Sequence, residues 1–247
     1  MFRVRSCILV LCLGVFLSYA GLPAEADIQS QVREATAGFR DVSLTARITY
    51  KNNAELDKVS TDFAKGYQLK TSTVTFKQPD KMKVEGKLGL FKVAMIINGD
   101  RKAFSIPSIH FTDRENIKGK PHQRQTDLDI GILTCSLWND YIVTEATTEK
   151  GSDGEVYKLV FVRSNAKNKS IACWADAKTL KILKVDKYAV NGSMKSRYIY
   201  SNHREFNGIW VPGKIDVYSQ DGKLAATTVY DNIRVNTGVS DSAFKIP

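Results

Sequence analysis

The fold is decided by four consecutive segments of the sequence: Leu180-Lys-Ile-Leu-Lys-Val-Asp-Lys-Tyr188, Ser196-Arg-Tyr-Ile-Tyr-Ser201, Ile209-Trp-Val-Pro-Gly-Lys-Ile-Asp-Val-Tyr218 and Thr227-Thr-Val-Tyr-Asp-Asn-Ile-Arg-Val-Asn236. They are rich in Val, Ile, Tyr, Trp and Thr, and apolar residues alternate with polar ones, as Ile215 and Val217 do with Lys214 and Asp216. This period of two predicts strands with one buried and one solvated face. Turns separate the segments, at Asn191-Gly192-Ser193, Asn207-Gly208 and Asp221-Gly222. Because such turns are too short to hold a crossover helix, they predict antiparallel hairpins.

The chain before this stretch extends the same sheet. Strand patterns recur over residues 43–50, 71–86, 88–106, 143–163 and 171–175, whereas residues 52–66 and 108–125 are polar and predict no regular structure. An apolar stripe at helical spacing predicts a short helix over residues 27–39. A second helix is predicted from Thr126 to Trp138, capped by Thr126 and Asp129 and apolar over more than half its circumference. In the C-terminal tail, Val239 and Phe244 are expected to pack back on the sheet.

These elements predict a mainly β (α+β) fold. We expect a single curled antiparallel sheet of ten or eleven strands, which forms an incomplete β-barrel because large sheets curl. The two helices are expected to lid the concave apolar face. A helix as apolar as the one over 126–138 either is ordinary core or lines a space that apolar ligands enter.

The first 26 residues predict a secretory signal peptide. Arg3 and Arg5 precede a short apolar run, and Ala24-Glu25-Ala26 supplies small residues for cleavage before Asp27. The mature domain is then expected to span 27–247 and to be soluble outside the cytoplasm. Two cysteines, Cys135 and Cys173, remain after cleavage. In an oxidising compartment they are candidates for one disulfide, with two buried thiols as the equal alternative.

The charged and polar residues show no catalytic grouping. The chain holds three histidines, at positions 110, 122 and 203, and no metal-ligand spacing, nucleophile elbow or glycine-rich phosphate loop. We therefore predict no catalytic residues, no metal, no cofactor and no enzymatic activity. The formal net charge is +10, but the lysines mostly alternate with apolar residues along strands and form no nucleic-acid motif. No nucleic-acid partner is expected.

With these elements placed, the chain resembles the periplasmic outer-membrane lipoprotein carrier family (LolA-like), in particular its larger lipoprotein-sorting members. Four stretches carry the likeness: 73–86 with its strand, Lys-x-Pro, strand pattern, the hairpin 95–100, the closing strands 207–215 and the terminal motif 236–247. In the best-known carriers an Arg before the proline helps to hold the lid closed. Here Gln78 occupies this lid-tether position, and an amide cannot form the charge-assisted bonds of a guanidinium.

The resemblance implies a periplasmic carrier that binds the acyl chains of lipoproteins or lipids in an apolar half-barrel. It also implies an inner-membrane donor transporter and an outer-membrane acceptor as partners. The alternative is a regulatory protein of the cell envelope that senses lipid or mislocalised lipoprotein. The predicted acyl-chain lining comes from the sheet at Leu44, Ile48, Phe76, Met82, Val84, Val93, Met95 and Phe104, and from the second helix at Leu128, Ile132 and Trp138.

Overall fold

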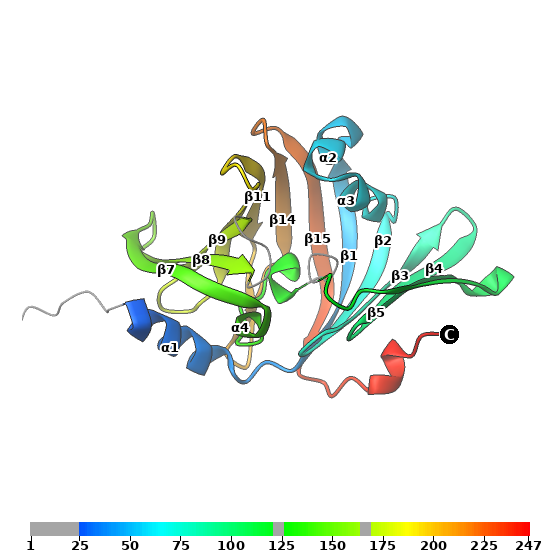
Figure 1. Cartoon of the computed structure of the whole chain (residues 1–247), viewed down its shortest axis with the longest axis horizontal. Coiled ribbons are helices and arrows are strands. Elements are labelled where there is room, and N and C mark those ends of the chain that lie inside the picture. Colours follow the sequence, from blue (N-terminus) through cyan, green and yellow to red (C-terminus); the bar gives the residue numbers. More distant parts are fainter. Residues whose placement is uncertain (1–24, 121–125, 164–168) are drawn as a thin grey trace, which may run out of the picture.

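The computed structural model describes residues 25–120, 126–163 and 169–247, and one large sheet dominates them (Figure 1). The sheet has 13 strands in the order β6-β5-β4-β3-β2-β1-β15-β14-β11-β10-β9-β8-β7, and all neighbours are antiparallel. The bounds are β1 (Asp41–Lys51), β2 (Thr71–Lys77), β3 (Lys81–Leu88), β4 (Phe91–Asn98), β5 (Arg101–Ile106), β6 (Phe111–Asn116), β7 (Tyr141–Lys150), β8 (Glu155–Arg163), β9 (Ser170–Asp176), β10 (Ile182–Tyr188), β11 (Met194–Ser201), β14 (Lys214–Ser219) and β15 (Leu224–Val235). The sheet curls without closing, which confirms the predicted fold class.

The predicted hairpin turns are present. A separate two-stranded hairpin joins β12 (Arg204–Phe206) to β13 (Ile209–Val211). Its loop is Asn207-Gly208, with φ of 52° and 84°. Two successive left-handed residues suit the right-handed twist of a two-residue hairpin, and Asn and Gly adopt this conformation at low cost.

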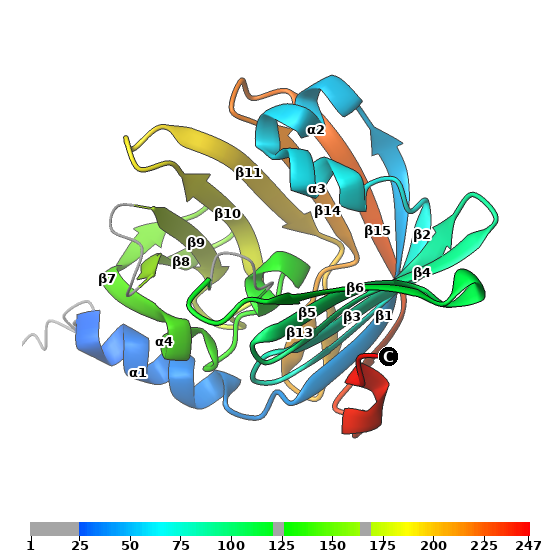
Figure 2. The same cartoon turned by 45° about the vertical axis from the view of Figure 1, so that its right-hand side comes forward.

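Helices and one irregular segment cover part of the concave face of the sheet (Figure 2). Helix α1 (Glu25–Thr36) packs against β7, while α2 (Asn53–Val59) and α3 (Thr61–Gly66) lie near β14 and β15. Residues 126–140, here called the insert, run across the same face between β6 and β7 and contain the 3-10 helix η3 (Asp127–Ile130) and the short α4 (Leu137–Asp140). A single apolar core joins these elements to the sheet.

The second predicted helix, over 126–138, is wrong as a continuous element. The helical turn η3 ends at Gly131, whose φ of 80° is left-handed. A side chain there would meet Tyr200 of β11 and Pro212, just after β13, at 2.6–2.8 Å, so only glycine allows the backbone to approach them this closely. The insert therefore turns where a helix would continue, and its apolar residues face the sheet from an irregular backbone.

Two stretches predicted to be irregular contain structure. Residues 52–66 form α2 and α3, and the edge strand β6 lies within 108–125. Asn52 accepts the Glu55 N–H and caps α2, and Glu55 in turn accepts the Ser219 hydroxyl at 2.5 Å. Lys58 bridges this carboxylate to Asp221 in the β14–β15 turn. These contacts fix α2 to one end of the curled sheet.

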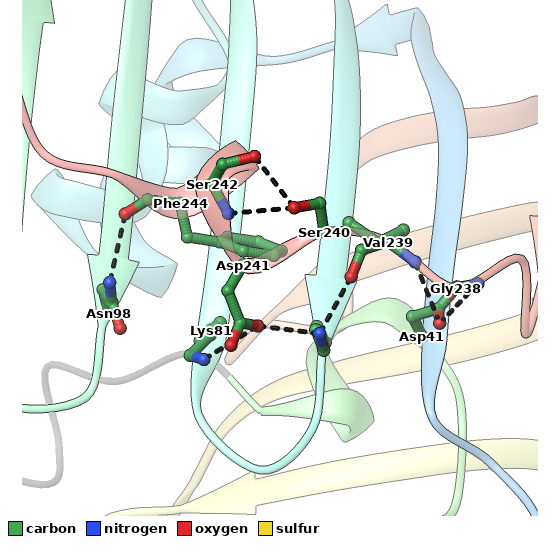
Figure 3. Close-up of polar contacts among 10 residues, drawn as sticks. Asp41, Lys81, Asn98, Gly238, Val239, Ser240, Asp241, Ser242 and Phe244 are labelled. Atoms are coloured by element: carbon green, nitrogen blue, oxygen red, sulfur yellow. Dashed lines mark hydrogen bonds and ion pairs between the residues drawn. The ribbon is translucent and has the colours of Figure 1, made fainter.

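The C-terminal segment packs on the opposite, convex face of the sheet, as expected for its apolar residues. Phe244, from the 3-10 helix η4 (Asp241–Phe244), is fully buried against Ala94 and Ile96 of β4. Figure 3 shows the polar contacts that hold it: Asp241 pairs with Lys77 at 2.7 Å and Lys81 at 3.0 Å, Asn98 donates to the Phe244 carbonyl, and Asp41 accepts the backbone N–H groups of Gly238 and Val239. The C-terminal segment thereby covers the part of the convex face around Ala94 and Ile96.

Residues 1–24 lie outside the described part of the chain, so the signal peptide remains a prediction. Helix α1 begins at Glu25, two residues before the predicted cleavage point. Across residues 25–120, 126–163 and 169–247, helices are too short or too polar to cross a lipid bilayer.

Candidate functional site

The eight sheet residues predicted to line a binding site share the concave face. Strand register pairs Leu44 with Val74, Val74 with Val84, Val84 with Met95, and Met95 with Phe104. Paired residues point to the same side of a sheet, and residues two apart on one strand do so as well. Each remaining predicted position is two or four residues from one of these paired positions on the same strand and therefore lies on the same face. These positions are Ile48, Phe76, Met82 and Val93.

Burial divides these residues into two groups. Leu44, Phe76, Met82 and Val93 are buried, whereas Ile48, Val84 and Met95 are half-buried and Phe104 is 38% exposed. Exposure rises toward the ends of β3–β6 that lie furthest from the insert. There the same face carries further apolar side chains that sequence analysis did not select. We call the half-buried and exposed apolar residues on this face of β3–β6 the open strip: Val84, Leu88, Phe91, Met95, Phe104, Ile106 and Phe111.

The predicted insert residues fill the other part of the concave face, here called the covered half, which is formed by β7–β11, β14 and β15. Leu128 and Ile132 are buried. Trp138 is half-buried, and its ring meets Phe161 of β8 edge to face at 5.6 Å and lies under the Arg33 guanidinium of α1. In this structure Leu128 and Ile132 belong to the apolar core, and Trp138 packs against it and against α1.

A partly buried ion pair fixes the insert to the sheet. The Lys187 ammonium of β10 lies 2.6 Å from the Asp129 carboxylate of η3, and the Tyr200 hydroxyl of β11 donates to the Leu128 carbonyl at 3.0 Å. Burial favours the neutral acid, but the attraction to Lys187 outweighs it and holds the pKa of Asp129 below its usual value. The pair therefore stays charged at neutral pH and ties η3 to β10.

The neighbouring carboxyl group, that of Asp127, is mainly protonated at neutral pH, in contrast to that of Asp129. Asp127 is buried, and the hydroxyl of Ser136, within the insert, donates to it at 3.0 Å. Burial is the main cause that raises the pKa of Asp127 to about 8, and the Asp129 charge adds to it. Asp127 is thus largely protonated at pH 7, which suits a carboxyl group enclosed by protein.

Gln78, the predicted lid-tether position, lies directly after β2. Its backbone N–H donates to the Arg40 carbonyl at 2.9 Å, but its buried side-chain amide nitrogen has no hydrogen-bond partner in the described chain. The cation that holds the insert is Lys187, on the other side of the concave face. The sequence could not identify it, because Lys187 and Asp129 are 58 residues apart.

The two cysteines are both free, Cys173 buried in β9 and Cys135 half-buried in the insert, so the candidate disulfide is not formed in this structure. Burial raises the pKa of the Cys173 thiol to about 12, which makes it unreactive. The described residues contain no group of His, Cys, Asp and Glu side chains placed to hold a metal ion.

A hollow of about 320 Å³ lies beside the covered half, between the end of α1, the insert and the β12–β13 hairpin. Its lining residues are Ala35, Thr36, Ile132, Leu133, Lys178, Thr179, Leu180, Glu205, Gly208, Ile209 and Trp210. The predicted lining residue Ile132 is among them. The concave face thus combines an apolar surface with an ion pair, Asp129 with Lys187, that ties the insert to β10.

Comparison with solved structures identifies the fold. A LolA superfamily protein from Nitrosomonas europaea matches with a TM-score of 0.59 and 15% identity, covering 88% of this chain and 97% of the other. A putative outer membrane lipoprotein-sorting protein domain from Vibrio parahaemolyticus matches with a TM-score of 0.54 and 11% identity, covering 88% and 94%. A DUF1329 family protein from Desulfovibrio piger has a TM-score of 0.50, 14% identity and coverage of 89% and 95%. No family model and no curated protein matches the sequence. The chain has a LolA-like fold.

Proposed function

We propose that this protein is a periplasmic carrier that binds the acyl chains of a lipoprotein or lipid on its concave face and delivers them toward the outer membrane. The observation that carries the proposal is the open strip, a run of apolar side chains that the insert and helices leave exposed. It is continuous with the core through the half-buried Val84, which packs against the core and pairs with Met95 across β3 and β4. Exposed apolar surface of this kind favours a site for an apolar ligand.

Binding of this kind requires burial and no bond chemistry. Each methylene removed from water contributes about 0.8 kcal/mol, so a long acyl chain gains much from a partly covered apolar face. The comparisons support this assignment through the names of two structures of the same fold, one of which is described as lipoprotein-sorting. Delivery to a second site requires a donor and an acceptor, which we propose to be membrane-associated proteins of the cell envelope.

The test is native mass spectrometry of the mature protein purified from periplasm, followed by extraction and identification of bound lipid. We expect near-stoichiometric lipid or lipoprotein. The variant Met95→Glu/Phe104→Glu places two charges on the open strip and should lose the bound lipid. Phe104 is 38% exposed, and Met95 is half-buried, so circular dichroism and thermal unfolding are needed to show that the variant folds.

A matched control is Ile142→Glu. Ile142 is 56% exposed, and because its neighbour Val143 pairs with the buried Phe161, it lies on the convex face of β7. It should keep its lipid. A wild-type protein that is empty and takes up no added lipid would refute the proposal, as would a folded double variant that carries as much lipid as Ile142→Glu. A carrier and a sensor would both need to bind lipid, so lipid binding is the first property to test.

A further inference from the structure

Exposed apolar side chains gather at one end of the sheet. The described chain exposes nine large hydrophobic residues, and six of them lie between positions 88 and 111: Leu88, Leu90, Phe91, Phe104, Ile109 and Phe111. Four of the six belong to the open strip. The other two, Leu90 and Ile109, occupy the links β3–β4 and β5–β6, and these two hairpin tips extend from the same end of the molecule (Figure 1 and Figure 2).

Both tips carry a largely exposed apolar side chain. Leu90 is 98% exposed and follows Gly89, whose φ of 61° shapes the turn. Ile109 is 55% exposed in the 3-10 helix η1 (Pro107–Ile109). A leucine held at a turn with almost its whole side chain in water contributes nothing to the core. Burial of such a side chain is favourable, and this gain is available to a partner.

The charges around the first tip are positive. Lys87 and Lys92 are exposed and lie directly opposite each other across β3 and β4, and the exposed Lys70 precedes the neighbouring β2. Neither Lys87 nor Lys92 has an ion-pair partner in the described part of the chain, and the one acidic residue between positions 86 and 112 is Asp100, in the turn at the other end of β4. Like charges opposite each other destabilise a strand pair, so a negatively charged partner would relieve a cost at this hairpin.

We propose that these two hairpin tips dock this end of the sheet on an anionic lipid surface. Leu90 and Ile109 enter the apolar boundary of the bilayer, and Lys70, Lys87 and Lys92 pair with lipid phosphates. An exposed apolar residue flanked by lysines matches the two terms of interfacial binding, apolar burial and attraction to anionic headgroups. The docked protein would present the open strip, which begins at Leu88 and Phe91, to the bilayer edge, so an acyl chain could cross with little exposure to water.

Vesicle flotation tests the proposal with the full mature chain. Wild-type protein is mixed with vesicles of phosphatidylethanolamine and phosphatidylglycerol, or of phosphatidylcholine alone, at low and high salt. We expect binding to the anionic vesicles that weakens with salt. The variant Leu90→Ser/Ile109→Ser should bind at least tenfold more weakly, because it removes the apolar burial that docking gains. Both positions are exposed, so folding should be unaffected.

Two further variants separate docking at the tips from a general attraction of a basic protein to anionic lipid. Lys87→Gln/Lys92→Gln should weaken binding to anionic vesicles alone, while Val190→Ser, at a residue 54% exposed in the β10–β11 turn, should bind as wild type. If wild type does not bind vesicles, or if Leu90→Ser/Ile109→Ser binds as tightly as Val190→Ser, the proposal is wrong and any attraction is due to overall charge. Failure of this proposal can be distinguished from failure of the acyl-chain proposal. Met95→Glu/Phe104→Glu should lose bound lipid and still float with vesicles.

Discussion

The covered half and the open strip of the concave face have similar side chains and opposite environments. In the covered half, Phe161 is fully buried, with Trp138 and Tyr141 packed edge to face against its ring. In the open strip, Phe104 lies on the same face of the same sheet and is 38% exposed. The alternation of apolar residues along the strands is the same in both. What differs is the set of elements that covers them.

This difference suggests how one sheet can combine stability with binding. The insert, α1, α2 and α3 cover one region so completely that its side chains act as core. No equivalent element among the described residues covers the far ends of β3–β6, so burial there is left to a ligand. If the division is correct, equal mutations in the two regions should have unequal effects on stability.

The largest expected effect is the truncation of the covered phenylalanine. Phe161→Ala should lower the free energy of unfolding by about 3–5 kcal/mol, because it leaves a cavity in place of a ring that packs against Trp138 and Tyr141. Phe104→Ala should change it by less than about 1 kcal/mol. Urea unfolding measures both. Equal losses of stability would show that the open strip is core and would remove the basis for a binding site there.

A pH-dependent effect of intermediate size is expected at Asp127, in the insert. Its folded pKa of about 8 exceeds the ordinary value of 3.8, so the folded state binds the proton more tightly and stability falls as pH rises between these values. Asp127→Asn keeps an acceptor for Ser136 and cannot ionise. It should therefore exceed wild type in stability at pH 8, and the gap should narrow toward pH 4.

Urea unfolding of both proteins across this pH range measures the gap. Ser152→Ala, in the exposed β7–β8 turn, serves as a control that should follow wild type at every pH. A gap that is constant with pH would mean that Asp127 does not titrate abnormally and that the insert is less enclosed than the structure indicates.

The tether of the insert should have a smaller effect. Lys187→Met leaves the Asp129 carboxylate without its cation, and since both groups are partly exposed we expect a loss of about 2 kcal/mol, less than for a fully buried pair. Amide exchange in residues 127–132 should quicken as well. The matched control is Lys184→Met on the same strand, whose ammonium stacks on the Trp174 ring at 3.4 Å and does not touch the insert. Equal exchange in the two variants would contradict a tether.

Much of the sheet could be predicted, because period-two alternation and Asn-Gly turns are local signals. The errors lie where local signals fail. Apart from Phe111, strand β6 is polar on both faces, as exposed edge strands often are, and so it showed no alternation. Helices α2 and α3 are short, although Asn52 three residues before Glu55 is a capping signal that could have revealed α2. The insert has helical composition, but Gly131 breaks it.

The candidate site could also be predicted only in part, because burial is not a local property of the sequence. Alternation placed eight residues on one face, but burial depends on segments far away in the sequence. No local pattern indicates that Leu44 is covered while Phe104 is exposed. In the sequence Lys187 resembles every other strand lysine, and only the position of β10 beneath η3 distinguishes it. Phe111 was hidden in a stretch that sequence analysis left without structure.

The smallest expected effect is at Gln78, where the two regions meet near the start of the insert. Its buried amide nitrogen lacks a partner among the described residues, and such a group costs stability. Replacement by a side chain of similar size without polar atoms, Gln78→Met, should therefore be neutral or stabilising by up to about 1 kcal/mol, and amide exchange in the insert should not change. Urea unfolding and hydrogen exchange measure this. If the variant instead loosened residues 127–132 as much as Lys187→Met, Gln78 would be a tether after all, held through contacts outside the described residues, and the covered half would depend on both sides of the concave face.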